Sequence, residues 1–160
     1  MVSTDAFESS VDFWEHIPID GETVEIGVTF TKKAIERLSD IPKGTKALFV
    51  NLGDKMVREA ITRLSQLGIN HIEFAPFFPG AAPVSGFDMA VTPAESRYVP
   101  DSVKSIVDIG QRVLDANTVV EIALKLKLDY LLEERKFKTY LQSIAANSYS
   151  FDELFGRSAR

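Results

Sequence analysis

The sequence predicts an α/β fold, in which a small, open, mostly parallel sheet is flanked by helices in a Rossmann or flavodoxin-like manner and followed by one long C-terminal helix. Short apolar runs alternate with amphipathic helical segments over residues 1–112, as strands and helices do in α/β domains. Residues 116–146 then contain no proline or glycine and are rich in Leu, Lys, Glu and Ala, which favour helix. We therefore expect an α/β domain over 1–112, a long helix over 113–147, and the start of another unit over 148–160.

The clearest α/β signal is a strand–helix–strand unit in the middle of the chain. Residues 46–52 (KALFVNL) form an apolar strand, and residues 55–67 carry apolar side chains on one helical face. Asp54 is placed to cap that helix, and Gly68 is placed to end it in the left-handed conformation. Residues 69–75 are the second strand, so the unit predicts two parallel strands.

Two further strands follow a loop. Residues 76–86 (PFFPGAAPVSG) hold three prolines and two glycines, which is typical of a loop. Residues 87–91 and 105–109 are short apolar runs that predict a third and a fourth strand. Residues 94–103 are expected to be irregular or to form a brief helix around residues 95–98. Together with the preceding unit, these elements give an open sheet of four strands.

The amino-terminal third begins with a predicted amphipathic helix over residues 3–16, in which Phe7, Val11 and Trp14 share one stripe. Residues 23–30 alternate apolar and polar side chains, as a strand does. A short helix over 32–38 is expected next. Its capping residue is Thr29 or Thr31.

The segment 116–146 predicts a helix about 45 Å long, capped by Asp115 or Asn117. A helix of this length exceeds what the preceding domain can cover, so it either projects into solvent or pairs with a second copy. Toward the end of this helix the apolar residues form only one narrow stripe, like the contact face of a coiled coil. This stripe, here called the seam, predicts a homodimer. The residues of this seam are Tyr130, Phe137, Leu141 and Ile144. The alternative is an ordinary C-terminal helix that folds back on its own domain.

Composition excludes several classes of function. The 160 residues have a formal net charge of −5 and no Lys/Arg cluster, which argues against direct binding of nucleic acid. The chain has no cysteine, which removes disulfides and thiolate chemistry, and two histidines without metal-ligand spacing. No cofactor is expected. The absence of a long apolar run and of a signal peptide predicts a cytoplasmic protein without membrane contact.

The candidate binding site lies where the strands end, because ligands of open parallel sheets bind beyond the carboxyl ends of the strands. The start of the helix after residue 54 also offers backbone N–H groups to an anion, although a simple turn and cap at Gly53 and Asp54 is the alternative. Arg97 and Arg112 are suited to hold a carboxylate by two parallel hydrogen bonds. The predicted ligand-contact residues are Asn51, Gly53, Asp54, Phe77, Phe78, Thr92, Glu95, Arg97 and Arg112.

No catalytic set accompanies this site. The sequence has no GxSxG and no Ser/His/Asp arrangement at recognisable spacing, so we expect a protein that is not an enzyme. Two alternatives stay open. The first is a small α/β enzyme or enzyme fragment that uses Asn51, Asp54, Glu95 and Arg97 for acid–base chemistry. The second is a dimerisation module without a ligand.

The last residues carry a family resemblance. Residues 148–158 (SYSFDELFGRS) resemble the junction of bacterial sigma-54-dependent transcriptional activators, where a linker helix ends and a PAS or AAA+ domain begins. The matching positions are Tyr149, Phe151, Asp152, Glu153, Leu154, Phe155, Gly156 and Ser158. Phe155 stands where isoleucine is commoner in the family.

Residues 87–126 are similar to the amino-terminal sensory regions of such regulators, including the propionate-catabolism activators. The resemblance implies a sensory domain that precedes an ATPase and a DNA-binding module. It also implies that residues 148–160 are the truncated start of the PAS or AAA+ domain. We therefore expect a signal-sensing domain that binds a small-molecule effector and relays its state through the C-terminal helix.

Overall fold

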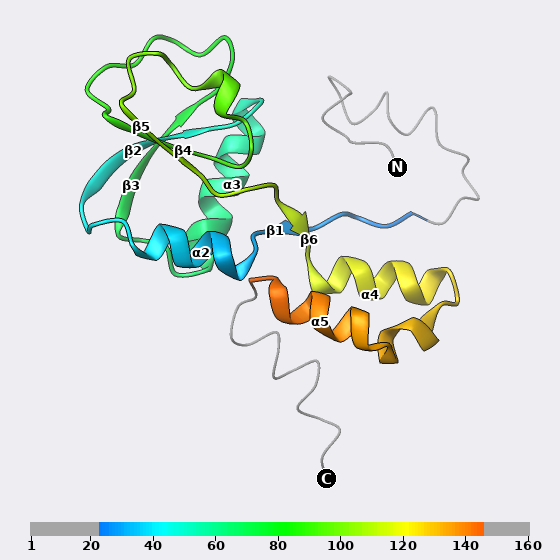
Figure 1. Ribbon diagram of the computed structural model, residues 1–160. Coiled ribbons are helices and arrows are strands. Elements are labelled where there is room, and N and C mark those ends of the chain that lie inside the picture. Colours follow the sequence, from blue (N-terminus) through cyan, green and yellow to red (C-terminus); the bar gives the residue numbers. More distant parts are fainter. Residues whose placement is uncertain (1–22, 146–160) are drawn as a thin grey trace, which may run out of the picture.

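The computed structural model describes residues 23–145 as a four-stranded parallel sheet with helices on one face, followed by a small helical pair (Figure 1). The expected strand–helix–strand unit is confirmed as β2 (Thr45–Val50), α3 (Asp54–Gln66) and β3 (Ile72–Phe77), with β2 and β3 parallel. The predicted helix over 3–16 and the junction phrase over 148–158 lie outside the described residues.

The other two predicted strands complete the sheet. They are β4 (Met89–Thr92) and β5 (Ser105–Asp108), and the strand order is β3-β2-β4-β5. Every neighbouring pair in this order is parallel, so the carboxyl ends of all four strands lie at one edge. This edge is where the candidate binding residues were expected.

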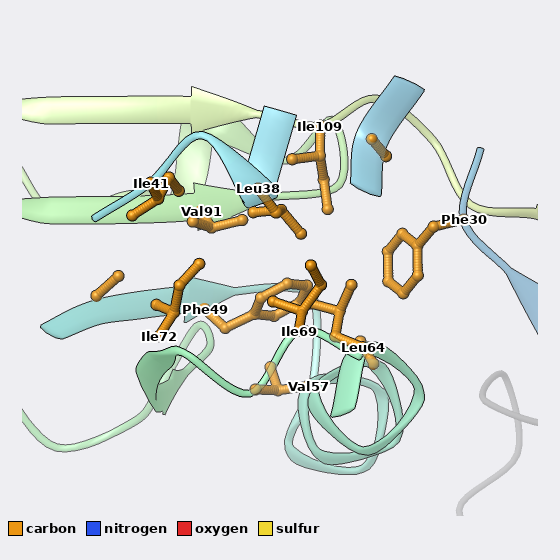
Figure 2. Packing of buried hydrophobic residues seen from close by; sticks show 13 residues of the cluster. Phe30, Leu38, Ile41, Phe49, Val57, Leu64, Ile69, Ile72, Val91 and Ile109 are labelled. Carbon is orange, nitrogen blue, oxygen red and sulfur yellow. The ribbon is translucent and has the colours of Figure 1, made fainter. Parts of the chain in front are cut away.

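The main core fills the space between the sheet and two helices, α2 (Lys32–Ser39) and α3. Alternate residues of β2 point to opposite faces, so Ala47 and Phe49 join this core while Leu48 and Val50 do not. Figure 2 shows Phe49, Ile69 and Leu64 gathered above the coil of α3. The helix over 32–38 is confirmed, and Thr31 rather than Thr29 caps it, accepting a hydrogen bond from Ala34 N at 3.2 Å.

The second face of the sheet is covered by loops. Leu48, Val50 and Ala90 are buried there against the 78–88 loop and the segment 96–103, which includes the short 3-10 helix η2 (Ser96–Tyr98). The brief helix expected around 95–98 is thereby confirmed. A doubly wound sheet would carry helices on both faces, whereas both helices that pack on the sheet's core in residues 23–145 lie on one face.

Residues 23–30 pair away from the main sheet. The predicted strand is reduced to β1 (Val28–Thr29), which pairs antiparallel with β6 (Val113–Leu114) to form a separate two-stranded ladder. Residues 23–27 lie beside α4 (Ala116–Lys125), the helix that follows β6. Gly27 N donates to Thr118 Oγ1 at 2.8 Å, and Lys125 Nζ donates to the carbonyl oxygen of Thr23. Irregular backbone satisfied by helix side chains thus replaces the expected strand.

The single long helix over 116–146 was predicted wrongly. The structure has three shorter pieces: α4, the 3-10 helix η3 (Asp129–Glu133) and α5 (Arg135–Ser143). α4 and α5 lie side by side, next to β1 and β6 and away from the four-stranded sheet (Figure 1). Asp115 is the N-cap of α4, as one of the two expected candidates, and its carboxylate accepts a hydrogen bond from Thr118 N at 2.8 Å.

The reason for the break is a helix end built without glycine. Lys127 has a φ of +56°, the left-handed conformation that usually belongs to glycine at this position. Leu128 N donates to Ala123 O at 2.8 Å and Lys127 N donates to Leu124 O at 3.1 Å, which is the Schellman pattern of hydrogen bonds. Gly68 ends α3 in the same pattern, and that end was predictable because glycine marks it.

The four seam residues therefore do not share one continuous helix. Leu141 and Ile144 are instead buried within their own subunit, with 3% and 1% of their surface exposed. Thr31 forms an isolated bridge with Ile144, and Ala145 N donates to Phe30 O at 2.7 Å. Tyr130 is 62% exposed and Phe137 is half-buried. The predicted seam thus loses its structural premise, while the predicted homodimer stays a prediction.

Tyr140 fastens α5 to the two-stranded ladder. Its hydroxyl donates to Leu114 O at 2.8 Å. Burial is the main cause that raises the pKa of Tyr140 above its ordinary value, and the nearby carboxylate of Asp115 adds to it. The helical pair is therefore held to the rest of the chain at both β6 and β1.

A glycine substitution tests the contact between residues 23–27 and α4. A Cβ on Gly27 would lie 2.1 Å from Asp115 Oδ2, so alanine there must displace the carboxylate that caps α4. We expect Gly27→Ala to lower the free energy of unfolding by about 1 kcal/mol, as loss of an N-cap does. Glu25→Ala is the control, because Glu25 is exposed on the same segment and its side chain makes no hydrogen bond among the described residues. Equal urea midpoints for the two variants would contradict the contact.

Candidate functional site

The carboxyl edge of the sheet combines two buried polar atoms that have no hydrogen-bond partner among the described residues. One is Asn51 Nδ2, directly after β2, on a side chain that is 2% exposed. The other is Glu95 Oε2, three residues after β4. Because β2 and β4 are neighbours, with Phe49 opposite Val91, the two residues follow adjacent strands at this edge.

The side chain of Asn51 is held by the backbone of the next residue. Its Oδ1 accepts a hydrogen bond from Leu52 N at 2.8 Å. The backbone N–H of Asn51 donates to Phe77 O at 3.2 Å. The amide nitrogen is then left as a donor with nothing to bond. An unsatisfied buried donor costs about 1–3 kcal/mol, which a bound acceptor would recover.

Glu95 is presented by a short, tightly bonded turn. Thr92 is fully buried and its Oγ1 accepts from Glu95 N at 3.0 Å. Ala94 has a φ of +67°, a costly backbone conformation for a residue with a Cβ. Strain of this kind is concentrated at functional sites. The turn thus holds the Glu95 carboxylate at the sheet edge at a local cost.

Arg97 is the charged neighbour of Glu95. Its Nη2 lies 3.3 Å from Glu95 Oε2, which is within ion-pair distance, but the contact lacks the geometry of a hydrogen bond. The Arg97 side chain is 70% exposed and its guanidinium stacks over the Tyr98 ring at 4.8 Å. The pair therefore contributes little to stability and can rearrange around a ligand.

Asp108 joins this turn to the segment that leads to α4. Its Oδ1 accepts hydrogen bonds from Ala94 N at 3.0 Å and from Gly110 N at 2.8 Å, and its Oδ2 lies 3.4 Å from Ser96 Oγ. Asp108 was not among the residues that the sequence predicted for the site. Its position as the last residue of β5 was the available signal.

The start of α3 differs from the expected capping arrangement. Gly53 is the N-cap, and Asp54 is the first helical residue rather than the cap. The Asp54 carboxylate instead accepts from Arg58 Nε at 2.9 Å through both oxygens. This contact raises the pKa of Arg58, chiefly through the hydrogen bond and then through the charge of Asp54. Asp54 is thereby engaged on the outer surface of α3.

The two predicted aromatic contacts are packing residues. Phe77 packs against the buried cluster on the loop-covered face, and Phe78 packs against the main core on the helix-covered face. Both side chains are half-buried. Each therefore frames the end of β3 instead of standing free over a cleft.

Arg112 is the one predicted residue that lies elsewhere. It lines a groove of about 500 Å³ between α3 and the β1–β6 ladder. The other charged groups there already have partners. Arg58 binds Asp54, Glu59 pairs with Lys55, Arg63 Nε lies 3.4 Å from Thr29 Oγ1, and Asp115 caps α4. A second hollow, of about 470 Å³, lies at the amino ends of β2, β4 and β5. Asn51 and Glu95 line neither hollow. We prefer the carboxyl edge as the candidate site because it holds the two buried polar atoms without a hydrogen bond.

The described residues hold no group of three or more metal-binding side chains, and none of their helices is long and apolar enough to cross a membrane. Comparison of the chain with family models, with curated proteins and with solved structures gave no significant match. The class that fold and site define is thus an α/β domain with a candidate binding edge.

Proposed function

We propose that the chain is a signal-sensing domain that binds a small polar molecule at the carboxyl edge of its sheet. The observation that carries this proposal is a pair of buried polar atoms without a hydrogen bond, Asn51 Nδ2 and Glu95 Oε2, on residues that follow adjacent strands. Asn51 supplies a donor and Glu95 supplies an acceptor. The effector class that suits them is a small molecule with an acceptor, such as a carboxylate or carbonyl, and a donor, such as an amine or hydroxyl.

The relay from this site runs through Asp108. A ligand that bonds Glu95 acts on the strained turn at Ala94, which Asp108 links to Gly110. Three residues beyond Gly110 begins β6, and α4 follows it directly. A change in the turn is thus passed on to α4 and α5. The ligand causes such a change only if it binds one arrangement of the turn more tightly than another.

The regulatory setting comes from the resemblance to sigma-54-dependent activators. In this proposal the domain precedes a PAS or AAA+ domain, and the helical pair passes the ligand state toward it. The doubly wound, Rossmann-like arrangement expected at first is not needed for this role, because the binding edge depends only on parallel strands. The homodimer remains part of the proposal, without the seam that a continuous helix would have provided.

An enzyme is the weaker alternative. Of its four residues, Asp54 is held by Arg58 on the surface of α3, and Arg97 stacks on Tyr98. That leaves Asn51 and Glu95, a donor and a single carboxylate, which suit binding better than paired acid–base chemistry.

A thermal-shift screen of small carboxylates, amino acids and hydroxy acids, followed by calorimetry of each hit, tests the proposal. We expect Asn51→Ala and Glu95→Gln each to weaken the hit at least about tenfold, the equivalent of about 1.4 kcal/mol. Asn117→Ala and Glu73→Gln are matched controls, since both residues are exposed and far from the edge. A hit that all four variants bind equally, or a screen without hits, would count against the site.

A further inference from the structure

A group of exposed apolar residues, here called the patch, extends from the last turn of α4 into η3. It consists of Leu124, Leu126, Tyr130 and Leu131, whose exposed fractions are 56%, 62%, 62% and 40%. Four of the seven large hydrophobic residues that are exposed among residues 23–145 fall within these eight positions. Such a concentration on one turn indicates a surface that another segment covers.

The described chain begins beside this patch. Residues 23–27 run along α4: Gly27 bonds Thr118 in the first turn of the helix, and Thr23 O accepts from Lys125 at its last residue. The chain that precedes Thr23 therefore departs from the same end of α4 that carries Leu124 and Leu126. A segment tethered there meets the patch at a high effective concentration.

The charges of the two parts are complementary. Residues 1–22 contain six acidic residues and no lysine or arginine. Residues 124–138 contain five basic and three acidic residues. Two of the basic residues, Lys125 and Lys138, already pair with Glu121 and Glu133, which leaves Lys127, Arg135 and Lys136 without an ion pair among the described residues. Opposite charges would thus surround an apolar contact.

We propose that the amino-terminal segment of the same chain, residues 3–16, binds this patch through its apolar stripe. Phe7, Val11 and Trp14 form that stripe in the sequence pattern, and the acidic residues between them face the basic rim. The helical pair is then covered by a strap from its own chain. The amino-terminal segment would thus contact the C-terminal end of α4. The ligand site is connected to the N-terminal end of α4, through β6.

Trp14 makes this proposal directly measurable, because it is the only tryptophan of the chain. In the intact 160-residue protein we expect Trp14 to emit at shorter wavelength than free tryptophan and to be protected from acrylamide. Replacing two patch residues together, Leu126→Asp and Leu131→Asp, shifts the emission to that of exposed tryptophan and raises quenching several-fold. Ile106→Asp is the control, since Ile106 is 48% exposed on the edge strand β5, away from the patch.

Circular dichroism of each variant verifies that the sheet is retained, so that a change in Trp14 reports the contact and not unfolding. If the double variant is unfolded, Lys127→Glu with Arg135→Glu provides the second test, with increased quenching expected. Fully exposed Trp14 in the intact protein, or protection that survives the patch substitutions, overturns the proposal. Protection that disappears across about a hundredfold dilution overturns it as well, and assigns the patch to a second copy instead.

Discussion

Phe49→Ala is expected to lower the free energy of unfolding by about 3–5 kcal/mol, the usual cost of removing a buried phenyl ring from a packed core. Phe49 is fully buried in the middle of β2, and its ring meets that of Phe74 edge to face, with centroids 5.5 Å apart. It also lies between the sheet and the helices of the main core (Figure 2). Removing the phenyl ring therefore loses the free energy gained by transferring it out of water, and it also leaves a cavity whose walls lose their contacts.

Urea denaturation followed by circular dichroism measures this change as a shift of the midpoint at constant slope. Ile106→Ala is the control, because Ile106 is 48% exposed at the sheet edge, and we expect its effect to stay within about 0.5 kcal/mol. A small loss for Phe49→Ala, comparable to that of the control, would mean that the helix-covered face is not the main core.

The parallel sheet was predictable because its signals are local. Each strand of the sheet is a short apolar run, and Gly68 marks the end of α3 by a residue type that tolerates positive φ. What sequence could not give was the covering of the second face, because loop packing depends on long-range contacts.

The C-terminal region was predicted poorly for the opposite reason. Lys127 takes the left-handed conformation although nothing in its residue type announces it, so α4 ends where helix propensity continues. Leu141 and Ile144 have the spacing of a seam, and the same spacing also suits a helix that packs within its own subunit. Periodicity identified the apolar face but not its partner.

The sequence predicted where the candidate site lies, but the structure changed the roles of several of its residues. The rule for parallel sheets brought Asn51, Thr92 and Glu95 to one edge, where the structure has them. It did not foresee that Thr92 would serve the turn or that Asp54 would bind Arg58, because side-chain hydrogen bonds depend on rotamers. Asp108 was missed since its three contacts come from residues that are distant in sequence or follow a turn.

Leu141→Ala is expected to cost about 2–5 kcal/mol of stability while leaving the oligomeric state unchanged. Leu141 is the buried residue of α5, 3% exposed, and the chain after α5 is fixed to the same subunit by the Thr31–Ile144 bridge and the Ala145–Phe30 hydrogen bond. The cavity it leaves lies inside one subunit. The loss of stability should therefore be independent of protein concentration.

The seam prediction leads to a different result for the same variant. If Leu141 packed against a second copy, its truncation would release monomers, and the melting temperature would vary with concentration because association stabilises by mass action. Thermal melts at several concentrations, together with gel filtration, separate the two cases. Leu52→Ala is the matched control: Leu52 is 42% exposed, so its truncation should change neither readout. A shift of Leu141→Ala toward a smaller species would restore the dimeric seam.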